Sequence, residues 1–158
     1  MDIENKIERL LSLEQGYIIT PYEKRYERNS RFDEYEEYLK KDFLNIYNKK
    51  ITKIILSLLC DLEVYTEITE ISEGHRLKEK YKEIEYTDIT KYCFNKLSEI
   101  IADFVVNGVS SMNIYFYNYD TLIVIEEGFS TCILGDNYDF IKMVKYKAEY
   151  ESLYFRKI

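Results

Sequence analysis

The sequence predicts an α+β fold in which a helical N-terminal two-thirds packs on a C-terminal three-stranded antiparallel meander, followed by a final helix. Apolar residues recur at helical spacing up to Asn107, the period changes to two after Gly108, and helical spacing returns after Asp136. Such segregation is typical of helices packed on one face of a sheet. A chain of 158 residues has the usual length of one domain. We therefore expect a single globular domain over residues 1–158.

The N-terminal part contains two predicted helices. Ile3, Ile7 and Leu10 predict a helix over residues 2–15, and Gly16 would end it. The charged segment 21–31 is either a short helix or an exposed connector. A long amphipathic helix is predicted from Phe32 to at least Cys60, because its apolar residues step by three and four.

Residues 62–72 fit two structures. Several β-branched residues and a short alternation favour a strand. However, Leu62, Tyr65, Ile68 and Ile71 also continue the helical stripe of the preceding segment. We predict a helix that ends at Gly74.

The remaining elements follow from clearer signals. Residues 88–107 predict a helix with Asp88 as its N-cap. Residues 113–119, 122–125 and 129–134 predict the three strands, separated by turn residues. Helical spacing over 137–158 predicts the last helix.

The composition is typical of a protein that binds a partner rather than one that catalyses a reaction. The chain has 17 Tyr, 8 Phe, one His and a formal charge of −7. Tyrosine supplies a large and stiff contact surface, whereas acidic residues select a basic partner. The three cysteines, at 60, 93 and 132, stand apart in apolar settings and are predicted to be buried thiols.

Two sets of residues are predicted to bind a partner. On a helix, Glu63, Glu67 and Glu70 would form one acidic stripe without basic neighbours. On a strand, Tyr115, Tyr117 and Tyr119 share parity and would project together from one sheet face. Each set also has a plain structural interpretation, as a solubilising face or as cross-strand pairs.

No signature of catalysis, cofactor binding or metal binding is present. The single His75 has no nucleophile motif near it, and no close cluster of Cys and His suits zinc. The glycines stand singly, so phosphate-binding loops are missing. We predict no catalytic residues, no cofactor and no metal ligand, and hence that the protein is not an enzyme.

The leading hypothesis is a non-catalytic acidic inhibitor that blocks a basic nucleic-acid-handling protein. Its composition is like that of nuclease inhibitors, toxin-immunity proteins and anti-CRISPR proteins. Direct binding to nucleic acid is not expected, because a chain of net charge −7 repels a polyanion. No stretch is apolar enough to span a membrane and no signal peptide is recognisable, so we expect a cytoplasmic protein.

Three alternatives remain open at the level of sequence. The first is an oligomeric structural or regulatory protein that self-associates through the tyrosine face. The second is a metal-assisted enzyme built on carboxylates such as Asp61 with Glu63, or Asp120 with Glu126 and Glu127. The third is single-strand nucleic-acid binding through the basic and aromatic segment 22–31.

Overall fold

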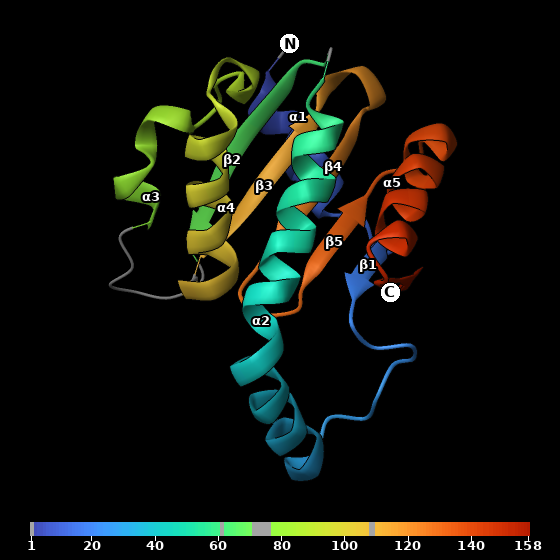
Figure 1. Ribbon diagram of the computed structural model, residues 1–158. Helices are drawn as coiled ribbons and strands as arrows, with labels where there is room; N and C mark the ends of the chain where they lie inside the picture. Colours follow the sequence, from blue (N-terminus) through green and yellow to red (C-terminus); the bar gives the residue numbers. More distant parts are fainter. Residues whose placement is uncertain (1, 61, 71–76, 108–109) are drawn as a thin grey trace.

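The centre of the fold is an antiparallel sheet (Figure 1), and the computed structural model describes residues 2–60, 62–70, 77–107 and 110–158. In these ranges the sheet has six strands in the order β2-β3-β4-β5-β1-β6. Their bounds are β1 Tyr17–Thr20, β2 Val64–Glu70, β3 Ser110–Phe116, β4 Thr121–Ile125, β5 Thr131–Leu134 and β6 Tyr154–Lys157. The prediction of a helical N-terminal two-thirds on a three-stranded sheet is therefore wrong. The meander β3-β4-β5 forms the middle of the sheet, but β1 and β2 come from the part predicted to be helical. The segment 137–158, predicted to be one helix, contains α5 (Tyr138–Tyr150) and then the strand β6.

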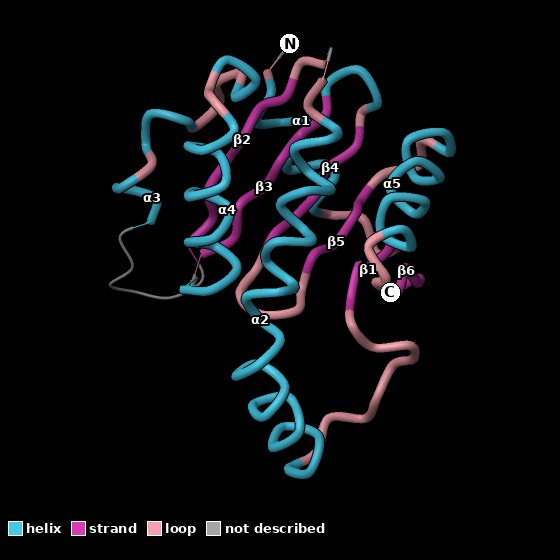
Figure 2. The backbone as a smooth tube through the Cα atoms, viewed as in Figure 1, coloured by secondary structure: helices cyan, strands magenta, loops and turns pink. Residues whose placement is uncertain are grey.

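Helices cover both faces of the sheet (Figure 2). On one face lie α2 (Ser30–Leu58), α4 (Phe94–Asn107) and α5 (Tyr138–Tyr150), with the short α3 (Leu77–Lys80) beside β2. On the other face lies α1 (Ile3–Leu11). Each face has its own apolar core, and the smaller one joins Ile7 and Leu10 of α1 to Tyr115, Leu122 and Val124 of the sheet.

Residues 64–70 form a strand, so the prediction of a helix over 62–72 is wrong in the described part, 62–70. β2 pairs with β3 along its whole length, with Thr66 opposite Ile114. Val64 and Ile68 enter the larger core, while Tyr65 faces the smaller one. Because both faces of this strand are partly covered, its apolar residues do not simply alternate with polar ones. Two of these apolar residues, Tyr65 and Ile68, are three positions apart, a spacing that also fits a helix.

The beginning of β1 depends on a close approach at Gly16. A Cβ atom there would lie 2.7 Å from the Ile133 carbonyl oxygen and 2.7 Å from a methyl group of Leu134. The first helix already ends at Leu11, with Ser12 as its C-cap. The expected role of Gly16 as a helix stop is thus incorrect, and its missing side chain instead lets the chain pass beside β5.

The two edges of the sheet differ. At the β2 edge, the Tyr86 N–H donates to the Thr66 carbonyl (2.6 Å), and the Val64 N–H donates to an Asp88 carboxylate oxygen (3.3 Å). At the other edge, β6 pairs with β1 only, among the strands of the described ranges. One edge is therefore covered and the other is open, which matters because an open edge can pair with another chain.

Two further expectations concern the burial of the three cysteines and the lack of a helix that could span a membrane. Cys60 and Cys93 are exposed and Cys132 is half-buried, so the prediction of three buried thiols is wrong. Cys60 lies just beyond the end of α2 and Cys93 just before α4, where the chain leaves the core. No helix within the described ranges is both long and apolar enough to cross a bilayer.

Candidate functional site: a projecting arm

The most unusual feature of the molecule is a projecting stretch without fully buried residues, which contacts the larger core only through half-buried side chains such as Leu39 and Phe43. Residues 21–46 comprise the loop after β1 and the first half of α2, and none of them is buried. The first buried residue of α2 is Tyr47. Figure 1 shows this loop and this half-helix extending beyond the sheet. We call residues 21–46 the arm.

Local interactions give the arm a defined structure. Asn29 caps α2, since its side-chain oxygen accepts from the N–H groups of Arg31 and Phe32 at 3.1 and 3.0 Å. The Phe32 ring lies 5.4 Å from the Tyr22 ring and 5.6 Å from the Tyr26 ring, measured between centroids. These aromatic contacts hold the loop against the helix.

A hydrogen bond reinforces this loop–helix contact. The Tyr22 hydroxyl donates to a Glu36 carboxylate oxygen at 3.1 Å. Burial and the neighbouring Glu36 charge raise the pKa of Tyr22 above its ordinary value. Tyr22 therefore stays protonated and keeps donating at every physiological pH.

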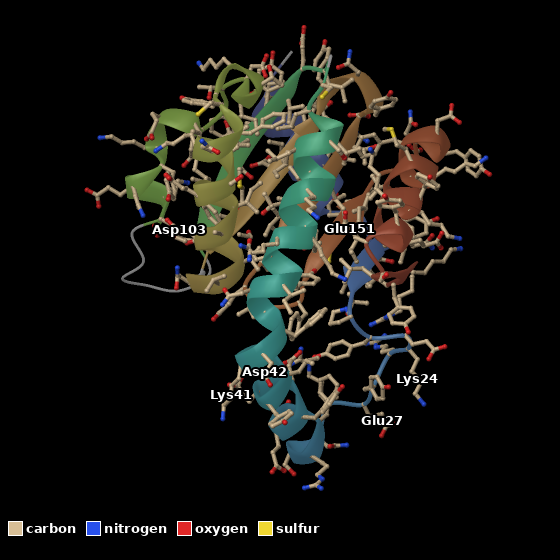
Figure 3. The ribbon with its side chains drawn as sticks, viewed as in Figure 1. Lys24, Glu27, Lys41, Asp42, Asp103 and Glu151 are labelled. Atoms are coloured by element: carbon tan, nitrogen blue, oxygen red, sulfur yellow. The ribbon has the colours of Figure 1, made fainter. Side chains whose placement is uncertain are left out.

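The outward side of the helical part carries tyrosines and carboxylates. Tyr35 is 51% exposed and Tyr38 is 66% exposed, values that are high for such large side chains. Glu34 and Tyr38 are one helical turn apart, as are Tyr35 and Tyr38, so they share a face. Figure 3 shows Asp42 on the same half of α2, next to Lys41. We call the tyrosines and carboxylates on the outward side of this half-helix the arm patch, which consists of Glu34, Tyr35, Glu37, Tyr38 and Asp42.

Ion pairs within the arm leave its carboxylates accessible. Arg31 lies 3.1 Å from Glu34, and Lys40 lies 3.3 Å from Glu37, with both carboxylate side chains 72% exposed. Exposed pairs of this kind contribute roughly 0–1 kcal/mol. A cationic partner can therefore replace them at little cost.

A groove of about 1090 Å³ lies at the base of the arm. Its basic lining residues are Arg25, Arg28, Lys40 and Arg156, and its acidic ones are Glu27, Glu36 and Glu127. Figure 3 labels Lys24 and Glu27 on the loop of the arm. Since the charges nearly balance, the groove has little net attraction for a polyanion. The segment 22–31 itself has four basic and two acidic residues, and single-strand nucleic-acid binding through it stays a prediction.

The sequence-predicted tyrosine row does not form. Tyr115 is 0% exposed and packs under α1, where its hydroxyl donates to Asp120 at 2.8 Å. The strand ends at Phe116, and Tyr117–Tyr119 form a single 3₁₀ turn. Tyr117 is exposed, but Tyr119 packs against Phe140 on the opposite side of the sheet, with ring centroids 4.9 Å apart. The alternation that predicted the row stops where the turn begins.

The predicted acidic stripe is also dispersed, because its residues lie on or beside a strand. Glu67 is 9% exposed and accepts hydrogen bonds from the Tyr86 hydroxyl (2.7 Å) and the Asn113 amide (2.8 Å). Glu63 lies just before β2, beside Tyr65, while the exposed Glu70 is at the far end of the strand. Of the six predicted contact residues, Glu63 and Tyr117 alone are close neighbours on the surface, joined by a backbone hydrogen bond of 3.1 Å.

The carboxylates proposed for a metal-assisted reaction are separated as well. Asp120 precedes β4 and Glu126 follows it, so they lie at opposite ends of that strand. Asp120 is paired instead with Arg9 (2.5 Å) and Lys6 (3.8 Å) of α1. In the described ranges, no three Asp, Glu, Cys or His side chains come close enough to hold a metal ion. Asp61 and His75 lie outside the described residues.

The comparisons with other proteins give no family. No protein-family model, no curated protein and no solved structure matches this chain significantly.

The sequence contained a signal for the arm that its helical periodicity obscured. Residues 33–38 read Asp-Glu-Tyr-Glu-Glu-Tyr, with four acids and two tyrosines in succession. The residues on the core side of this stretch are half-buried rather than buried, as at Leu39 and Phe43. Periodicity alone does not indicate whether a partner element lies opposite an apolar stripe.

Proposed function

We propose that this protein is a non-catalytic inhibitor that binds and blocks a basic nucleic-acid-handling protein, such as a nuclease or a nuclease toxin, in the cytoplasm. The observation that carries the proposal is the arm, in which exposed tyrosines and carboxylates project from the body on a helix that has no fully buried residue from 30 to 46. Tyrosines are frequent hot spots of protein interfaces, and carboxylates guide association with a basic surface.

The geometry of the arm suits entry into a cleft. The loop covers one side of this half-helix near Phe32 and Glu36, so the opposite side, with the arm patch, is the one that can face a groove that otherwise holds a nucleic-acid strand. The carboxylates of the arm patch would then replace phosphates as partners of the cleft's Lys and Arg side chains. Their present partners are the exposed Arg31 and the half-buried Lys40, and ion pairs of this kind at a protein surface are easily displaced.

The test compares two pairs of tyrosines. The double variant Tyr35→Ser and Tyr38→Ser removes the rings of the arm patch, while Tyr146→Ser and Tyr150→Ser removes two rings from α5 that are even more exposed. Affinity capture from the source cell, followed by mass spectrometry, should recover a basic nucleic-acid-handling protein with the wild type and the α5 variant. The arm variant should lose it.

A second measurement decides whether the complex is inhibitory. The purified partner's action on DNA or RNA should decrease with added wild-type protein and recover when the arm variant is used. Loss of binding of about 2 kcal/mol or more per ring is expected for hot-spot tyrosines. Equal capture by both double variants, or a captured partner whose activity is unaffected, would show that the arm has no inhibitory role.

A further inference from the structure

The open edge of the sheet carries a second surface, which differs from the arm in charge. It consists of the outward side of α5 and the strand β6, and a groove of about 1080 Å³ runs between them. Tyr138 and Tyr146 of α5 line this groove and are 72% and 69% exposed. Tyr17 and Phe155 form its floor, stacked with their centroids 5.0 Å apart. We call this surface the C-terminal groove.

The C-terminal groove is locally basic in an acidic molecule. Its lining includes the cations Lys142, Lys145, Arg156 and Lys157, against the carboxylates Asp136 and Glu149. Of these carboxylates, Glu149 lies 3.9 Å from Lys145 and partly neutralises it. The chain as a whole carries −7. Because the screening length at physiological salt is about 8 Å, a ligand in the groove responds to the nearby cations more than to the distant acids.

Within the described ranges, no strand pairs with the outer side of the β6 backbone along this surface. The Ile158 N–H donates to the Gly16 carbonyl at 3.0 Å, and Lys157 stands opposite Tyr17. In an antiparallel ladder, hydrogen-bonded and non-hydrogen-bonded pairs alternate. It follows that the N–H and C=O groups of Phe155 and Lys157 point away from β1, toward the open edge.

The opposite edge of the sheet, at β2, is covered by another part of the chain. There the segment after α3 crosses β2, and its backbone at Tyr86 takes up the free Thr66 carbonyl. No comparable segment lies against the outer edge of β6 in the described part of the chain. The β6 edge combines unpaired backbone groups, an aromatic floor and flanking lysines.

We propose that β6 accepts an extended acidic segment of another protein as an added strand. The segment would pair through its backbone with Phe155 and Lys157, and its carboxylates would meet Lys142, Lys145 and Lys157. Strand addition of this kind takes its affinity from backbone hydrogen bonds and its specificity from side chains. A second copy of this chain is a poor occupant, because two β6 strands would bring the cations Arg156 and Lys157 of both copies together.

The probe is a short fluorescent peptide of alternating Glu and Val, followed by anisotropy. Two matched peptides separate the two contributions. In one, Lys replaces every Glu, which removes the charge complementarity. In the other, alternate backbone nitrogens are methylated, which removes hydrogen bonding along one edge of the peptide. We expect binding of the first peptide and much weaker binding of both controls.

Protein variants locate the site. Lys157→Pro removes one outward N–H from an edge strand, where proline is tolerated, and Lys157→Ala removes only the charge. Lys157→Pro should weaken binding about fivefold more than Lys157→Ala, which corresponds to one hydrogen bond. Lys142→Glu with Lys145→Glu should weaken it about tenfold or more, whereas Lys82→Glu with Lys91→Glu, exposed beside β2, should leave it nearly unchanged.

Several results would overturn the proposal. Equal binding of the methylated peptide would mean electrostatic adhesion without strand pairing. Tighter binding of a single-stranded oligonucleotide than of the acidic peptide would identify a nucleic-acid surface. Sedimentation showing self-association that Lys157→Pro abolishes would identify a second copy as the occupant. The arm variant Tyr35→Ser with Tyr38→Ser should bind the peptide normally, so failure of either proposal leaves the other intact.

Discussion

At the scale of single residues, the carboxylates of this chain have distinct structural tasks. Glu67 is nearly buried and fixes Tyr86 and Asn113, and Asp120 joins α1 to the turn after β3. Tyr86 and Asp120 both have positive φ angles, of 54° and 46°, which L-residues seldom adopt. Each of the two residues has polar contacts in this conformation, Tyr86 with Glu67 and Thr66, and Asp120 with Tyr115 and Arg9. Removal of these contacts should therefore lower the stability of the protein.

Glu67→Ala should destabilise the protein by about 1–3 kcal/mol, because it leaves the buried Asn113 amide and the Tyr86 hydroxyl with one partner fewer. Glu67→Gln should cost less. Its amide N–H can donate to the Asn113 Oδ1, which has no partner at present, once the Asn113 amide turns over. Urea unfolding measures both differences. Equal stability of the Ala and Gln variants would show that these hydrogen bonds contribute little.

Asp120 gives the stability a defined dependence on pH. Burial opposes ionisation of this carboxyl, but hydrogen bonds from Tyr115 and Arg9 and the Lys6 charge outweigh it and lower its pKa. A lowered pKa adds stability that is present above the unfolded value of about 3.9 and is lost as pH falls through the folded value.

The Asp120→Asn variant should therefore be less stable than the wild type near neutral pH. Its stability should also decline less steeply than that of the wild type below about pH 4. Asparagine tolerates the left-handed backbone and can still accept from the Tyr115 hydroxyl, so it isolates the charge. Urea midpoints measured across this pH range test the prediction. Parallel curves for the two proteins would exclude an electrostatic role for Asp120.

At the scale of elements, α2 is one helix with two environments. Its second half has fully buried residues from Tyr47 onward, and its first half forms the arm, whose core-side residues are half-buried. Tyr47 marks the boundary and is 0% exposed. Its hydroxyl donates to the Ile19 carbonyl of β1 (2.8 Å) and lies 3.0 Å from the Thr131 hydroxyl of β5. Tyr47 thus fixes the base of the arm to the sheet.

Tyr47→Phe should destabilise the protein by about 1–3 kcal/mol, because it keeps the ring but leaves the buried Ile19 carbonyl and Thr131 hydroxyl without this partner. Tyr38→Phe is the matched control on the exposed half of the same helix, and it should change the stability by less than about 0.5 kcal/mol. Thermal or urea unfolding gives both values. A neutral effect of Tyr47→Phe would contradict its role as an anchor.

At the scale of the whole molecule, charge is distributed unevenly. The arm patch offers carboxylates, the C-terminal groove offers lysines, and the total is −7. The two surfaces lie on different elements, so one molecule could hold two partners of opposite charge. Net charge governs the approach of a partner from a distance, and the local surface governs how long it stays.

For the arm's basic partner, the association rate should fall steeply as salt increases, while the dissociation rate changes much less. The physical reason is that screening removes long-range attraction but not the packed tyrosine contacts. Stopped-flow or surface-binding kinetics over a range of salt concentrations measures both rates. An association rate that is independent of salt would show that the net charge does not accelerate binding of the partner.

The sequence by itself determined the helices that have long periodicity and the meander whose turns are marked by Gly and Asp. Strands β1, β2 and β6 could not be assigned, because segments of four to seven residues contain too few repeats to distinguish a period of two from 3.6.

Only the tertiary structure decided which acids and tyrosines are available to a partner. Tyr115 and Tyr38 are the same side chain in composition, yet one lies under α1 and the other on a projecting helix. Burial depends on which element comes to lie opposite a residue, and that is set by sheet order and strand pairing. Such long-range pairing leaves no mark in a local pattern, which is why the contact surface that we propose lies on the arm and not on the predicted stripe.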